Sequence, residues 1–296
     1  MKIIENRYKF IAVPVTIMLI GILCMIYNGV TGNGFLNFDV DFKGGTSIQL
    51  DLGKEFNNDD VAKIVTDITG QEAPQVQKVV GTTQVLIKTT SLDAAKRTAL
   101  IKKLTETYGV TSESANVSDV SATVSNEMQT TALLAVGVSC LAMLVYISFR
   151  FRNVIYGGSA ILALLNDALV VLAAYAIFRI PVDYSFIAAL LTVIGFSINS
   201  TIVIFDRMRE NKKIHNRIAD NELVNSSVTQ TLRRSIFTTT TTLIALLCLY
   251  IFGVSSIRNF TLPIIIGIVC GLYSSVFVSG SLWYTLKNMG KKEARV

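Results

Sequence analysis

The chain has 296 residues, 51% of them hydrophobic and only 16% charged, and its mean hydropathy is +0.51, so we expect several membrane spans instead of a single soluble core. The net charge of +6 is uneven: residues 29–130 hold 9 Lys or Arg against 13 Asp or Glu, so the basic excess lies at membrane ends and not on a nucleic-acid-binding face. The one histidine lies in a basic loop and the four cysteines lie in apolar runs without metal-ligand spacing, so we expect no metal site and no histidine-based hydrolase.

The first predicted element is a membrane helix over residues 10–27. Its 18 uncharged residues follow a start that carries Lys2, Arg7 and Lys9, and this length is close to the minimum that spans a bilayer core. A cleaved signal peptide begins in a similar way. We favour a retained anchor, with residues 1–28 forming the cytoplasmic start and the first helix, because the apolar run is long and no small-residue cleavage pattern follows it.

Residues 29–130 have the composition of a soluble domain outside the membrane. Their apolar spacing alternates between the periods of strands and of helices. In chain order we expect strands at residues 38–42 and 48–52, a helix at 59–69 ended by Gly70, a hairpin of strands at 76–80 and 85–87, a helix capped by Ser91 and ended by Gly109, and a strand near 115–120. This order predicts an α+β domain of the ferredoxin-like, split βαβ type.

Residues 131–296 are predicted to form a membrane domain of five helices. The predicted spans cover residues 132–149, 154–178, 184–205, 235–253 and 260–286. The loop at 206–234 holds seven Lys or Arg residues, whereas the next connection holds only Arg258. By the positive-inside rule we expect both termini and this loop in the cytoplasm. The mixed charges of the loop favour an amphipathic helix that lies in the headgroup layer.

Asp167 is the only charged residue within the predicted spans and lies near the middle of the third. An isolated charge at the bilayer centre costs about 2.5–3.5 kcal/mol on insertion scales, so the side chain must be protonated, paired or hydrated. We favour an ion or proton site. The alternative is a structural hydrogen bond to another helix.

Further polar residues lie at the fourth and fifth spans. Arg234 stands at the cytoplasmic entrance of the fifth span, and Thr238 begins a run of five threonines one turn later. These hydroxyls can line a hydrated path, or they can bond back to their own helix. Asn199, Ser200 and Thr201 of the fourth span likewise suit either ion conduction or helix packing. A GxxxG pattern in the sixth span, at Gly267 and Gly271, predicts close packing.

Several sequence blocks, in order along nearly the whole chain, resemble the SecF family, the smaller membrane subunits of the bacterial SecDF protein-export auxiliary complex. The external domain carries DFKGGT, with Asp41, Phe42, Gly44, Gly45 and Thr46. The fourth span ends in the charged cytoplasmic-loop block, with Asp206, Arg207, Arg209, Glu210 and Asn211. The other blocks are YISFRF, TLRRSIFTTTTT and GLYSSVFV.

The resemblance implies a six-span half of a transporter of the resistance-nodulation-division class, which pairs with SecD in the inner membrane. It implies a non-enzymatic subunit that uses no cofactor and promotes preprotein export through the SecYEG translocon with the energy of a proton gradient. The preprotein and membrane lipid are further expected contacts, and YajC is an additional candidate partner. The alternatives are a small-molecule or lipid exporter of the same class and a translocon scaffold without ion coupling.

Two positions depart from the family pattern. The family ties ion coupling to an Arg that matches Arg234 and to an Asp in the fourth span, but this chain has Ser200 in place of that Asp. Asn166 stands where the family often has a His before Asp167. Both changes remove a titratable group. Coupling through Asp167 and Arg234 with protons is one alternative, and sodium bound by the neutral oxygens of residues 199–201 is the other.

Overall fold

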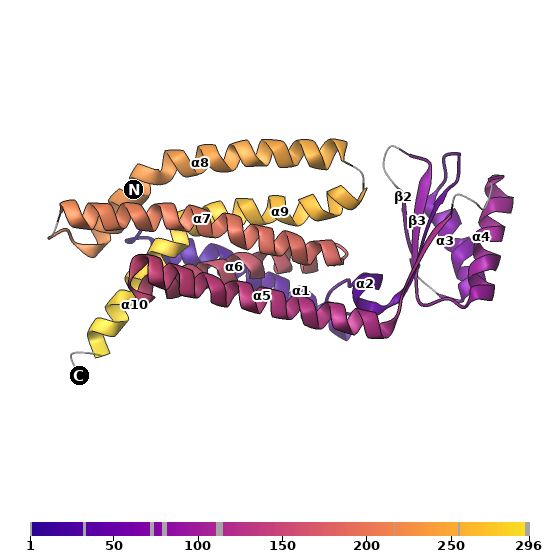
Figure 1. The fold of residues 1–296 in the computed structure, drawn as a ribbon, viewed down its shortest axis with the longest axis horizontal. Coiled ribbons are helices and arrows are strands. Elements are labelled where there is room, and N and C mark those ends of the chain that lie inside the picture. Colours follow the sequence, from indigo (N-terminus) through magenta and orange to yellow (C-terminus); the bar gives the residue numbers. More distant parts are fainter. Residues whose placement is uncertain are drawn as a thin grey trace.

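The computed structural model describes residues 2–31, 34–71, 74–78, 82–110, 115–215, 217–253 and 255–293. The molecule is elongated, with a bundle of long helices at one end and a small sheet domain at the other (Figure 1). Helix α1 begins and helix α10 ends at the end of the bundle far from the sheet (Figure 1). The two chain ends therefore lie opposite the sheet domain.

Six helical segments among the described residues are long and apolar enough to cross a membrane. They are α1 (Arg7–Val30), α5 (Ala122–Phe151), α6 (Val154–Phe178), α7 (Tyr184–Ile214), α8 (Asp220–Phe252), and α9 (Ser255–Tyr273), which continues through the π-helix η2 (Ser274–Ser279) into α10 (Gly280–Glu293). The six predicted spans are thus confirmed, and the chain is a multi-pass membrane protein. In Figure 1, α8 lies at the periphery of the bundle.

The sheet domain has the predicted split βαβ topology. Its elements are β1 (Gly45–Asp51), α3 (Asn58–Thr69), β2 (Gln75–Lys78), β3 (Gln84–Thr89), α4 (Ala94–Tyr108) and β4 (Asn116–Val120). The strands pair antiparallel in the order β2-β3-β1-β4. Ile48 lies opposite Ile87, and both pack with Leu100 and Leu104 of α4 in a core that is fully buried. The predicted turn after Lys78 lies outside the described residues.

The strand predicted at residues 38–42 is wrong. Part of this stretch is the short helix α2 (Val40–Lys43). The Asp39 carboxylate accepts from the backbone N–H of Val40 at 2.7 Å, and Gly44, with φ of 76°, ends the turn. A capping acid and a C-terminal glycine outweigh three alternating apolar residues. Phe38 forms only a single bridge, with Val182.

The predicted cap at Ser91 is also wrong, by two residues. Asp93 is the N-cap of α4, and the helix begins at Ala94. The backbone N–H of Leu92 donates to Thr46 Oγ1 at 3.0 Å, which holds Leu92 in front of the helix. Gly70 and Gly109 end α3 and α4 in the left-handed conformation, as predicted.

The predicted surface helix within residues 206–234 is not a separate element. Helix α7 continues to Ile214 and α8 already begins at Asp220, so the two form a helical hairpin. Asn211 Nδ2 donates to Ser227 Oγ and to Gln230 Oε1, both at 2.9 Å. The apolar side chains of this part of α8 pack into the protein core and not into a headgroup layer: Leu223, Val224 and Val228 are buried.

Helices α7 and α9 pack closely because two glycines of α9 face side chains of α7. A Cβ added to Gly267 of α9 would lie 2.3 Å from Val193 Cγ2 of α7, and one at Gly271 would lie 3.1 Å from Ser197. The close packing predicted for this GxxxG pattern is confirmed. It brings η2 against α6 and α7 at the place where the buried polar residues lie.

Candidate functional site

A buried carboxylate lies at the centre of the membrane bundle. Asp167 of α6 is 1% exposed. Its Oδ2 accepts hydrogen bonds from Ser197 Oγ of α7 at 2.5 Å and from Ser274 Oγ of η2 at 2.8 Å. Asn166 Nδ2 lies 3.4 Å from Oδ1. Because one carboxylate oxygen binds hydroxyls from two other elements, the charge state of Asp167 bears directly on how three helical segments pack.

A second layer of hydroxyls adjoins this carboxylate. Thr201 Oγ1 and Ser275 Oγ lie 3.1 Å apart, and Ser275 Oγ also donates to the backbone carbonyl of Ser197 at 3.4 Å. The π-helix accounts for two consecutive inward-facing serines, since its wider turn buries both Ser274 and Ser275 completely. The sequence pointed to Asp167 and Thr201, but it gave no signal for the helical irregularity that adds the two serines.

The remaining predicted coupling residues do not join this cluster. Arg234, Thr238 and Asn199 are exposed on α8 and α7, and Ser200 is half-buried. Among the described residues, no hydrogen bond or ion pair joins Arg234 to Asp167. The structure thus separates the predicted set into members of a buried carboxylate cluster and exposed or half-buried polar residues of α7 and α8.

The threonine run after Arg234 uses part of its hydroxyls locally. Thr241 Oγ1 and Thr242 Oγ1 donate back to the backbone carbonyl of Thr238, at 2.9 and 3.0 Å. Thr239 is different, because its buried Oγ1 has no hydrogen-bond partner in the described part of the chain. For Thr241 and Thr242 the structure therefore supports the self-bonding alternative.

The charged block at residues 206–211 ties three helices together. Arg150 of α5 pairs with Asp206 at 3.2 Å, and Arg207 Nη1 pairs with Glu210 at 2.8 Å. Arg207 Nε also donates to Gln230 Oε1 of α8 at 2.6 Å. Arg209 of the same block is half-buried, and Asn211 is buried against α8. The block is therefore built as a joint between α5, α7 and α8.

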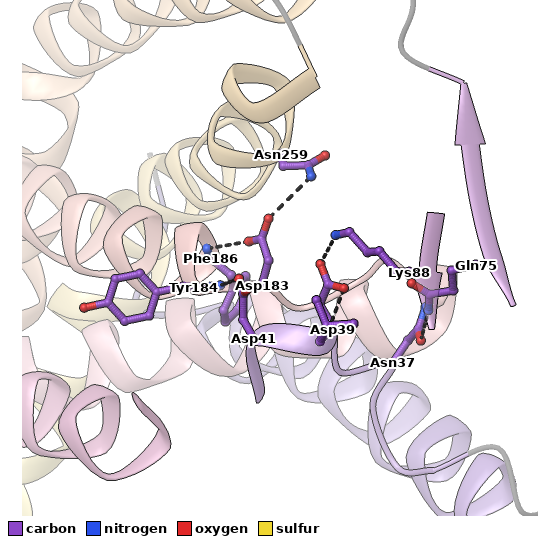
Figure 2. Close-up of polar contacts among 10 residues, drawn as sticks. Asn37, Asp39, Asp41, Gln75, Lys88, Asp183, Tyr184, Phe186 and Asn259 are labelled. Atoms are coloured by element: carbon purple, nitrogen blue, oxygen red, sulfur yellow. Dashed lines mark hydrogen bonds and ion pairs between the residues drawn. The ribbon is translucent and has the colours of Figure 1, made fainter. Parts of the chain in front are cut away.

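The DFKGGT block lies between the sheet domain and the membrane helices (Figure 2). Asp41 Oδ2 accepts from the backbone N–H of Tyr184 at 3.0 Å, and Phe42 is buried. Gly45 has φ of 151°, and a Cβ there would lie 2.3 Å from the carbonyl oxygen of Thr89. Thr46 accepts from the backbone of Leu92. The block thus contacts the membrane domain through Asp41 and the rest of the sheet domain through Gly45 and Thr46.

Three further charged residues at this junction were missed by sequence reasoning. The Asp39 carboxylate forms an ion pair with the Lys88 ammonium, and both side chains are largely buried. Asp183 caps α7 by accepting from the backbone N–H of Phe186 at 3.0 Å, and Asn259 Nδ2 lies 3.4 Å from its other oxygen (Figure 2). The position of Asp183 immediately before an apolar run was a capping signal that the sequence did offer.

The titration of Asp183 is set by its surroundings. Burial raises the pKa of this carboxyl above the ordinary aspartate value, and the capping hydrogen bond from Phe186 lowers it. The Lys88 ammonium also lowers the pKa, whereas the Asp39 and Asp41 carboxylates raise it. The outer junction is thus a group of mutually interacting charges.

The sequence of this chain is similar to those of known proteins over nearly its whole length. The family model described as "Protein export membrane protein SecD/SecF, C-terminal" matches residues 100–289. The chain is 33% identical to the protein translocase subunit SecF of Sebaldella termitidis, over 98% of this chain and 93% of that protein. It is 38% identical to the protein translocase subunit SecF of Alicyclobacillus acidocaldarius, over 87% of this chain and 85% of that protein.

Solved structures agree with this similarity. A crystal structure of SecDF, a translocon-associated membrane protein from Thermus thermophilus, superposes with a TM-score of 0.85 at 30% identity and covers 97% of this chain. A SecDF crystal structure in a super-membrane-facing form superposes with a TM-score of 0.68 at 28% identity. The chain spans 39% and 40% of those two SecDF chains.

Proposed function

Because the chain belongs to the SecD/SecF family of protein-export membrane proteins, we propose that it is a SecF-type, non-enzymatic subunit that assists preprotein export by the Sec translocase. It spans most of the length of its SecF relatives but only two fifths of the SecDF chains. SecD supplies the other half of the transporter. The SecYEG channel delivers the preprotein, and YajC is a further partner of the assembly. The termini and the α7–α8 turn lie in the cytoplasm and the sheet domain lies outside the bacterial inner membrane.

The observation that carries the proposed coupling is the Asp167 cluster. A carboxylate that is 1% exposed within a membrane bundle is costly unless its charge is compensated. Here two hydroxyl donors from α7 and η2 compensate it. Binding or loss of a cation at Asp167 changes these hydrogen bonds and therefore shifts α6 relative to α7 and η2. The proton is the coupling ion favoured by family membership, and sodium is the alternative that the surrounding hydroxyl oxygens suit.

The exposed polar residues Asn199 of α7 and Arg234 and Thr238 of α8 complete the coupling path in complex with SecD. Exposed polar side chains on transmembrane helices face protein or water and not lipid. Carboxylates of SecD that approach Arg234 provide the titratable groups that Ser200 and Asn166 do not. This arrangement makes Arg234 a residue of the complex and not of the isolated subunit.

The test is secretion of a reporter preprotein in cells depleted of this protein and complemented with variants. We expect Asp167→Asn and Arg234→Gln to slow export at normal membrane levels, because each removes a charge from the path. Arg233→Gln is the matched control, because Arg233 is the neighbouring exposed arginine of α8 and its guanidinium lies 5.5 Å from the Phe237 ring. Normal export with both Asp167→Asn and Arg234→Gln would favour the scaffold alternative.

The coupling ion is decided in inverted membrane vesicles by varying the sodium and proton gradients separately. Export that depends on the proton gradient and is indifferent to sodium supports a proton relay. Export that follows the sodium gradient at constant pH would overturn it in favour of sodium coupling.

A further inference from the structure

The sheet domain rests on a junction segment, residues 34–44, which separates it from the membrane helices (Figure 2). Figure 2 shows Asp39 and Asp41 of this segment, Lys88 of β3 and Asp183 at the start of α7 close to one another. The junction segment therefore has two joints, one to the helices and one to the sheet. They are built from different kinds of interaction.

The joint to the membrane helices includes two hydrogen bonds between backbone groups. The N–H of Asp39 donates to the carbonyl of Val182 at 3.0 Å, and the N–H of Val182 donates to the carbonyl of Asn37 at 2.8 Å. Ser125 Oγ of α5 also donates to the carbonyl of Asp41 at 3.0 Å. These three bonds involve no charged side chain, so they hold the junction segment to the helices whether or not the Lys88–Asp39 pair is closed.

The joint to the sheet is made by side chains. The Lys88 ammonium pairs with the Asp39 carboxylate, and Gln75 Nε2 donates to Asn37 Oδ1 at 3.0 Å. The two charged side chains are 11% and 1% exposed, respectively. Loss of one member of such a buried pair leaves the other charge uncompensated, which strongly disfavours the paired arrangement. This joint is the one that charge can open.

Two cavities adjoin the sheet. One, of about 340 Å³, lies between the junction segment and the sheet beside the ion pair, and Lys43 and Lys88 are among its lining residues. The other, of about 410 Å³, lies between the sheet and the membrane helices and is lined by Gln77 of β2 and Tyr250 of α8 among others. The sheet therefore has room to tilt toward both.

We propose that the Lys88–Asp39 ion pair is a latch that holds the sheet domain upright on the junction segment, and that opening of this ion pair releases the domain to tilt. The tilt takes place about the two chain connections at Gly44–Gly45 and at Ser121. Gly44 and Gly45 have positive φ, of 76° and 151°. Neither carries a side chain of its own that would hinder a change of the backbone angles. The latch is independent of the proposed ion coupling, because it concerns only how the sheet is held.

The test measures the position of the sheet domain in the full-length protein in lipid nanodiscs. Spin labels on Lys103→Cys of α4 and Leu249→Cys of α8, with the four native cysteines replaced by alanine, report the distance between domain and membrane by pulsed electron resonance. We expect a narrow distance distribution for the parent and for Lys88→Arg, which keeps the pair. For Lys88→Met we expect a second population that rises from a minor state to roughly half of the molecules or more.

Two further variants make the outcome decisive. Lys78→Met is the matched control, because Lys78 lies on neighbouring strand β2 and pairs at 3.6 Å with Glu55, which is 94% exposed. Asp39→Asn opens the pair without changing the sheet and keeps an oxygen for the Val40 cap, so it reads out the latch even if Lys88→Met destabilises β3. The proposal is overturned if Asp39→Asn gives the same narrow distribution as Lys78→Met.

Discussion

Single residues at the junction have requirements that their neighbours do not share. Gly44, Gly45 and Gly70 all have positive φ, but the space around them differs. A Cβ at Gly45 would lie 2.3 Å from a backbone oxygen, whereas nothing lies within 4 Å of one at Gly70. A residue with a Cβ would therefore be both strained and in collision with its surroundings at position 45, whereas at position 70 it would only be strained.

We expect Gly45→Ala to destabilise the sheet domain by clearly more than about 1 kcal/mol, because alanine is both strained at positive φ and in contact with Thr89 O. Gly70→Ala is the control and should cost no more than about 1 kcal/mol. Hydrogen exchange of β1 and β3 in the full-length protein measures both. Equal protection in the two variants would show that the collision is relieved by movement of β3.

We expect the stability of the folded protein to depend on pH through Asp183. Burial raises its pKa in the folded protein, so the folded state holds this proton more tightly than the unfolded state does. The ionised carboxylate therefore costs stability at neutral pH, and the cost disappears as the pH falls through the raised pKa. Asp183→Asn keeps the oxygen that caps α7 but cannot ionise.

We accordingly expect Asp183→Asn to be at least as stable as the parent at neutral pH. The parent should become more stable on mild acidification as Asp183 is protonated, and Asp183→Asn should not show this increase. Asp183→Ala removes the cap and should cost about 0.5–2 kcal/mol at every pH. Thermal unfolding in nanodiscs between pH 7 and pH 4 measures these differences. A parent protein whose stability at this site falls on acidification would contradict the assignment.

At the scale of whole elements, a helix or strand can be predicted from the sequence when the interactions that form it lie within its own segment. The six spans and the split βαβ order follow from apolar periods, and Gly70 and Gly109 mark the ends of helices. Helix α2 was missed although Asp39 and Gly44 are local cap signals, because three alternating apolar residues indicated a strand. The contacts of this segment with Val182 and Tyr184, about 140 residues away, cannot be read from the sequence. The α7–α8 hairpin was missed because the pairing of Asn211 with Ser227 is a tertiary contact.

Packing of α9 on α7 gives a prediction at this scale. We expect Gly267→Ala to destabilise the bundle by about 1–3 kcal/mol, because the new methyl group meets Val193. Val193→Ala should restore part of the loss in the double variant, with a coupling of about 0.5–3 kcal/mol. Unfolding in mixed micelles is the measurement, and Gly195→Ala, which meets nothing within 4 Å, is the control. If the effects of the two substitutions on stability are additive, the methyl group introduced by Gly267→Ala does not collide with Val193.

Over the whole molecule, the candidate site was only partly predictable. The sequence singled out Asp167 because a charge within an apolar span is costly, and it singled out Thr201 by its place among polar residues. Ser197 and Ser274 are neutral residues 30 and 107 positions from Asp167, and only the fold brings them to its carboxylate. Arg234 and Thr238 lie on the outer surface of this chain, so their setting depends on the partner half.

The direct passage from β4 into α5 has a mechanical consequence. Only Ser121 separates the strand from a 30-residue helix, which is about 45 Å long at the standard helical rise. At its far end the helix is held by the Arg150–Asp206 ion pair. The pivot at Ser121 therefore lies directly on the outer end of this long helix. Any displacement of α5 near the α7–α8 turn moves the point about which the sheet domain tilts, with almost no loop to absorb it.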